Sequence, residues 1–153
     1  MVVATPQPLA ALYVADETAW LESMADAARR RDAGALDWDN LREYLTDMAQ
    51  RDRREVKSRL VVLLAHLLKW DNQPDRRSGG WRATVIEQRQ RLADLAGRGV
   101  LKAHAEAILA EAYEEAVELA AAETDLPRAT FPATCGYDLD GLLTVNLAGD
   151  DDV

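Results

Sequence analysis

A chain of 153 residues, 48% hydrophobic and 29% charged, is long enough to bury a core and has a globular rather than a disordered composition. The formal net charge of -9 argues against nucleic-acid binding, and a single cysteine excludes a disulfide within the chain. No signal peptide is evident, and the longest apolar run, residues 60–68, is far shorter than the about 20 residues that span a bilayer. We therefore expect one cytoplasmic domain over residues 1–153, off the membrane, with loose ends at 1–11 and 147–153.

Capping residues and apolar stripes indicate two helical stretches in the first third of the chain. After a lead-in containing Pro6 and Pro8, a helix is expected to begin at Asp16, which can cap it, and to end at Gly34. Its stripe contains Tyr13, Trp20, Met24, Ala27 and Arg31. A second stretch is capped by Asp37 or Asp39, and its stripe contains Leu41, Tyr44, Leu45 and Met48.

The stretch Gln50–Glu55 is entirely polar, and apolar periodicity resumes at Val56 on a face shifted by a quarter turn. Residues 39–70 form either one long helix or two that meet near Arg51–Arg54; because no Pro or Gly interrupts them, we favour one helix. From Val56 to Trp70 more than half of the circumference is apolar, which is typical of a central helix. Pro74 ends it.

Two more helices are expected after this loop. One runs from Trp81 to Ala96 and can be capped by Ser78. The next runs from Val100 to Glu123, with an inner face of Leu101, Ala105, Ile108, Ala112, Ala116 and Leu119. The remainder reads as a mostly irregular tail with one short turn at Asp138–Leu143. No run alternates as a strand does, so we expect an all-α fold, a single antiparallel bundle of four or five helices.

Charge is segregated along the chain. Residues 51–98 contain twelve Lys and Arg against six Asp and Glu, a net of +6, whereas residues 100–153 contain two against twelve, a net of -10. The basic segment could bind an anion or an acidic partner. We favour the simpler interpretation, in which the two segments are neighbouring helices whose charges offset each other.

Two polar residues interrupt apolar faces. His66 lies one turn before Trp70, and it is either a general base, proton switch or ligand donor, or a partly buried histidine with a structural hydrogen bond. Gln88 falls in the apolar stripe of the helix expected from Trp81 to Ala96, where it either contacts a ligand or bonds to carbonyls of the loop 72–78. We favour the structural interpretation of both.

Three arginines and two tryptophans surround the loop before the third helix. The arginines could bind a carboxylate or phosphate at a helix N-terminus, or they could hold the loop in place by packing on indole rings and pairing with acidic groups. The candidate ligand-binding residues are His66, Trp70, Arg76, Arg77, Trp81, Arg82 and Gln88. Neither histidine follows a glutamate by three residues, as a dimetal helical bundle requires, so we expect no metal, and we expect no cofactor.

The run Leu60–Arg91 carries an ordered set of uncommon residues, namely His66, Leu67-Leu68-Lys69-Trp70, Gln73-Pro74, Arg77-Ser78, Trp81-Arg82 and Glu87-Gln88-Arg89. In this it closely resembles the core of the bacterial family named domain of unknown function twenty-nine. Leu12-Tyr13, Asp16 and Trp20 look like the opening of that family, and Glu111-Ala112-Tyr113 and Phe131-Pro132 with Cys135 look like its closing part. Gly79-Gly80 replaces more usual polar residues, which suggests a looser loop. The resemblance implies an all-helical fold and no established activity.

The leading functional hypothesis is a non-enzymatic cytoplasmic module that binds another protein or itself. The alternative is a small enzyme or anionic-ligand-binding domain that uses the seven candidate residues. Nucleic-acid binding through residues 51–91 is the weakest hypothesis, because the whole chain is acidic.

Overall fold

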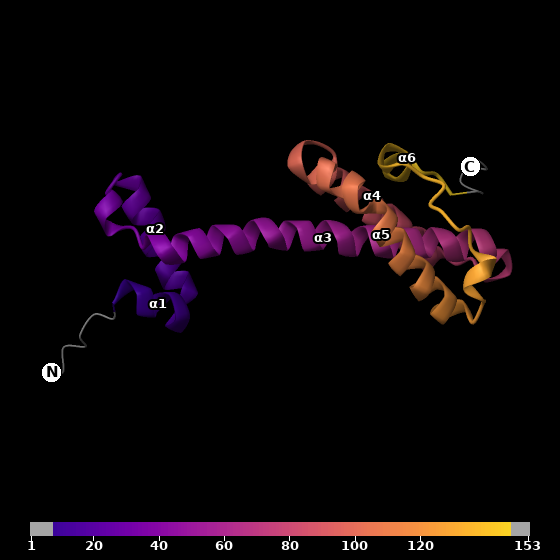
Figure 1. Ribbon diagram of the computed structural model, residues 1–153, viewed down its shortest axis with the longest axis horizontal. Helices are drawn as coiled ribbons and strands as arrows, with labels where there is room; N and C mark the ends of the chain where they lie inside the picture. Colours follow the sequence, from indigo (N-terminus) through magenta and orange to yellow (C-terminus); the bar gives the residue numbers. More distant parts are fainter. Residues whose placement is uncertain (1–7, 148–153) are drawn as a thin grey trace. The chain divides into compact units, whose positions relative to one another are not determined.

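The computed structural model describes residues 8–147, and within them the chain is built from α-helices and short 3-10 turns (Figure 1). No strand occurs in that range, which confirms the all-α prediction. The chain is divided into two compact units, Met1–Gln50 and Arg51–Val153. The expected loose ends at residues 1–7 and 148–153 lie outside the described residues.

The first unit contains α1 (Leu9–Ala15), α2 (Glu17–Arg29), a 3-10 turn (Ala33–Ala35) and the beginning of α3 (Trp38–Asn72). Residues 9–11 were expected in the loose lead-in, but they are helical. The Asp16 side chain caps α2 as predicted, by accepting a hydrogen bond from the Ala19 amide at 3.1 Å. The helix ends at Arg29, before Gly34, because Arg31 adopts a left-handed φ of 54°.

A tryptophan fills the centre of the first unit. The Trp20 ring lies 4.7 Å from the Tyr13 ring and 5.8 Å from the Tyr44 ring, measured between centroids. Its indole N–H donates to the Asp37 carboxylate at 3.0 Å. Within residues 8–50 only Trp20, Met24 and Ala27 are buried, so this core is thin. Arg31, expected on the same stripe, is exposed because it lies beyond the end of α2.

Helix α3 is a single helix of 35 residues, as favoured above, and the polar stretch Gln50–Glu55 does not break it. From Val56 onward most of its apolar side chains are buried, and they form the centre of the second unit. The predicted residues are all among them: Val56, Leu60, Leu63, Leu64, Leu67, Leu68 and Trp70.

The second unit adds α4 (Gly79–Ala96), α5 (Gly99–Thr124) and α6 (Leu139–Thr144), with 3-10 turns at Pro74–Arg76 and Arg128–Thr130. Helix α4 packs against α5 and α6 (Figure 1). Ser78 caps α4 by accepting from the Trp81 amide at 3.2 Å, so Gly79 and Gly80 form its first turn instead of a loose loop.

The inner face of α5 is lined by small residues, and Ala105, Ala112, Ala116 and Ala120 have no exposed surface. Leu119 was expected on that face, but it is 44% exposed, and Tyr113 and Val117 are buried instead. Leu147 was expected in a loose end, but it is buried in the core.

Ion pairs join the basic and acidic segments. Lys57 of α3 lies 2.8 Å from Glu111 and 2.7 Å from Glu115 of α5, and Lys69 lies 2.6 Å from Glu123. This confirms that the two segments are neighbours whose charges partly offset each other. Among the described residues, no helix combines the length and the apolar character that crossing a membrane requires.

Candidate functional site

Three of the seven candidate residues meet at the end of α3. The Trp70 side chain is buried, and the guanidinium carbons of Arg77 and Arg82 lie 4.9 Å and 5.6 Å from the centre of its ring. The Nε of Arg77 also donates to the Trp70 carbonyl at 2.9 Å. These contacts attach the start of α4 and the preceding loop to α3. The Nε1 of Trp70 is buried and has no hydrogen-bond partner among the described residues.

The second tryptophan, Trp81, faces a lysine that is not among the seven candidate residues. Lys69 is buried, its ammonium nitrogen lies 5.1 Å from the centre of the Trp81 ring, and it pairs with Glu123. The sequence did contain a signal for this burial, because Lys69 lies between Leu68 and Trp70 on an apolar helix. Arg76, in the 3-10 turn Pro74–Arg76, is exposed.

His66 and Gln88 make their hydrogen bonds away from Arg76, Arg77 and Arg82. The Nδ1 of His66 lies 2.8 Å from the Val62 carbonyl, which can only accept, so Nδ1 carries the proton. Burial lowers the pKa of His66 and the Lys69 charge adds to this, against the opposing effects of the Val62 carbonyl and Glu123. Gln88 accepts from Arg59 Nη1 at 3.2 Å, so its expected bond to the loop 72–78 is wrong. Whether any of the seven residues binds a ligand stays a prediction.

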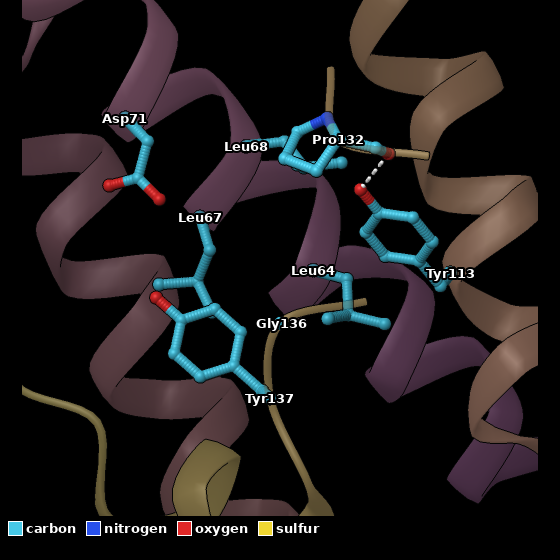
Figure 2. A pocket seen from close by; sticks show the side chains of 8 residues that line it. All are labelled: Leu64, Leu67, Leu68, Asp71, Tyr113, Pro132, Gly136 and Tyr137. Carbon is cyan, nitrogen blue, oxygen red and sulfur yellow. Dashed lines mark hydrogen bonds between the residues drawn. The ribbon is translucent and has the colours of Figure 1, made fainter. Parts of the chain in front are cut away.

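A cavity of about 370 Å³ lies elsewhere in the second unit, between α3, α5 and the segment before α6 (Figure 2). None of the seven candidate residues lines it. Its walls are largely apolar and contain two tyrosines and one carboxylate. The lining residues are Leu64, Leu67, Leu68, Asp71, Tyr113, Pro132, Gly136 and Tyr137.

The polar groups of this cavity differ in how they are bonded. Tyr113 donates its hydroxyl hydrogen to the Pro132 carbonyl at 2.6 Å. Within residues 8–147 neither the Asp71 carboxylate nor the Tyr137 hydroxyl has a hydrogen bond or an ion pair. Burial raises the pKa of Asp71, although Arg77 opposes this, and burial followed by the Asp71 charge raises the pKa of Tyr137.

Sequence reasoning missed Asp71, although a signal was present. Leu64, Leu67, Leu68 and Asp71 follow the spacing of one helix face, so a carboxylate extends an apolar stripe by one turn. The opposite wall, from α5 and the tail, is formed by contacts that spacing within α3 does not encode.

Within residues 8–147, no three His, Cys, Asp or Glu side chains come together as metal ligands would. No curated protein and no solved structure matches the chain. The family described as domain of unknown function DUF29 matches residues 12–147, which is most of the sequence. The chain therefore belongs to the DUF29 family.

Proposed function

We propose that this protein is a non-enzymatic cytoplasmic interaction module whose first unit holds a partner helix against α3. The observation that carries the proposal is a pair of exposed large hydrophobic side chains above a thin core. Trp38 is 60% exposed and Leu45 is 58% exposed. They are seven residues apart, so they lie on the same side of α3, with half-buried Leu41 beside them. The single cysteine supports the cytoplasmic part of the proposal.

Trp38 is suited to a binding role because its orientation is already fixed. Its indole N–H donates to the Ala33 carbonyl at 3.1 Å, while most of its surface faces solvent. A side chain held in place loses little conformational entropy when a partner covers it, and tryptophan is a frequent binding hot spot. Leucine seven residues later gives the spacing that a second amphipathic helix matches.

The charge beside this row favours one kind of partner. Asp39, Glu43 and Asp47 are exposed and spaced by four residues, so they form an acidic row on the flank of Trp38 and Leu45. Residues 8–50 carry nine Asp and Glu against four Arg, a net of -5. A second copy would place acidic residues near acidic residues, which is unfavourable. The partner that fits is an amphipathic helix with a basic flank.

A site-specific photo-cross-link tests the proposal. The variant Trp38→p-benzoylphenylalanine keeps an aromatic side chain on the exposed row, and Leu119→p-benzoylphenylalanine is the control on α5, where Leu119 is also exposed. We expect position 38, and not position 119, to cross-link one protein in native cells, at a segment that forms a basic amphipathic helix. Reversing the charges of Asp39, Glu43 and Asp47 to Lys should abolish that cross-link.

Other outcomes would contradict the proposal. Cross-linking to a second copy of the chain would replace the basic partner with self-association. The same products from positions 38 and 119, or no product from either, would remove the first unit as a docking element.

A second candidate function, binding of an anion, has one observation in its favour. The buried Nε1 of Trp70 lacks a partner among the described residues, and the guanidinium groups of Arg77 and Arg82 lie against the same indole. Titration with inorganic phosphate should then shift the NMR signal of the Trp70 indole N–H, and Arg77→Gln should weaken the effect more than Arg76→Gln. No shift, or equal effects of both variants, would exclude this candidate.

A further inference from the structure

We infer that the cavity between α3, α5 and the segment before α6 is a binding site for a small apolar amine, whose ammonium group pairs with Asp71 (Figure 2). This site is in the second unit and is separate from the docking row of the first.

The size and the walls suit a small molecule with an apolar body. The volume of about 370 Å³ lies within the range of small-ligand sites, about 300–1,000 Å³. Leu64, Leu67 and Leu68 of α3 form one side, and the rings of Tyr113 and Tyr137 lie across from each other in Figure 2. Binding of aliphatic or aromatic carbon to such a surface is favourable, because it removes apolar area from water.

The polar groups set the orientation of the ligand. Core packing already uses the Tyr113 hydroxyl, which donates to Pro132. The two groups that remain unbonded within the described residues, the Asp71 carboxylate and the Tyr137 hydroxyl, lie on the same side of the cavity in Figure 2. Burial and then the Asp71 charge raise the pKa of Tyr137, as expected for two groups on the same side of the cavity. One end of the cavity is therefore anionic and hydrogen-bonding, and the rest is apolar.

The chemistry of Asp71 favours a cationic ligand. Partial burial raises the pKa of its carboxyl, which means that the fold disfavours the charged form, and a bound ammonium would offset this effect. The Arg77 guanidinium opposes this shift, but it is stacked on Trp70 and donates to the Trp70 carbonyl. An ammonium can donate to the carboxylate and to the Tyr137 oxygen at once, whereas an anionic ligand is repelled. Although neighbouring groups partly shield its carboxyl, Asp71 as a residue is exposed, so a ligand reaches it without opening the core.

Phenethylamine is the probe. The controls carry the same ring: 3-phenylpropionate is negatively charged, and 2-phenylethanol is uncharged. Binding is followed by amide and side-chain NMR shifts of the full chain at neutral pH. We expect saturable binding of phenethylamine, weaker binding of the alcohol and none of the carboxylate. Asp71→Asn should weaken the amine about tenfold or more, the loss expected for a charged hydrogen bond. Asp75→Asn, at an exposed carboxylate in the 3-10 turn that follows α3, should leave it unchanged.

Several results would overturn the inference. One is the absence of saturable phenethylamine binding up to about 10 mM. Another is binding of 3-phenylpropionate as tight as that of phenethylamine. A third is an equal loss of phenethylamine affinity in Asp71→Asn and Asp75→Asn. Tyr137→Phe provides a second variant, with an expected loss smaller than that of Asp71→Asn, in case the latter unfolds. Equal binding to wild type and Tyr137→Phe would remove the tyrosine hydroxyl from the site.

Discussion

The variant Asp37→Ala tests what holds residues 8–50 together. The Asp37 carboxylate accepts hydrogen bonds from the Asn40 side-chain amide at 2.8 Å and from the indole N–H of Trp20 at 3.0 Å. The Asn40 side chain, then Trp20 and the Asn40 backbone amide, lower the pKa of Asp37 against the effect of burial. One side chain therefore caps α3 and also satisfies a buried indole.

The two losses set the magnitude. Loss of an N-cap costs about 1 kcal/mol, and an orphaned buried N–H costs about 1–3 kcal/mol. Asp37 is only half-buried, so water can replace part of its contact with Trp20, and the lower value applies. We expect Asp37→Ala to lower the free energy of unfolding of residues 8–50 by about 2 kcal/mol. Asp39→Ala, at an exposed carboxylate in the same turn, is the matched control and should have little effect.

Amide hydrogen exchange resolves the two units separately. A loss of about 2 kcal/mol speeds exchange about 30-fold. We expect this acceleration in α2, whose buried Trp20 loses its partner, and no change in α5. The reasoning would be refuted if Asp39→Ala accelerated α2 as much, or if exchange in α2 and α5 increased equally.

Three further predictions concern stability. The pKa of His66 is lowered in the fold, so the contribution of neutral His66 to stability should be complete above the unfolded pKa of about 6.5. The wild type should lose stability as the pH falls through that value towards the folded pKa. In urea titrations His66→Gln should flatten this loss, whereas His104→Gln should not. Gly99 has a φ of +70°, so Gly99→Ala should lower the free energy of unfolding by about 1 kcal/mol. Gly136→Ala should be nearly neutral in the same assay, because a Cβ at Gly136 would meet no other atom within 4 Å. Leu92→Ala should cost about 2–5 kcal/mol in chemical denaturation, because Leu92 is fully buried; a cost below about 1 kcal/mol would contradict its place in the core.

Local chemistry made most helix boundaries predictable. Asp16 and Ser78 are caps that act on their own chain neighbours, and Pro74 ends a helix through its own ring. The length of α3 was also predictable, because nothing in Gln50–Glu55 breaks a helix. Helix α1 was missed because it has seven residues and depends on Tyr13 reaching Trp20, a contact outside the helix itself.

The candidate site was less predictable, because its contacts join distant parts of the chain. Tryptophan–arginine packing at Trp70 was foreseen from residue types alone. The partner of Gln88 is Arg59, 29 residues earlier, and spacing within one helix does not identify such a pair. The cavity forms only where Tyr113 and Tyr137 come close to the end of α3, so only the packed second unit reveals it.

The alanine face of α5 implies that the two central helices respond to mutation in opposite ways. At Ala105, Ala112, Ala116 and Ala120 the side chain is already minimal and fully covered, so every larger residue would force α5 away from its neighbours. On α3 the inner positions are large, so truncation there leaves empty volume. A saturation mutagenesis screen for folded protein should therefore reject gains in volume along α5 and losses in volume along α3.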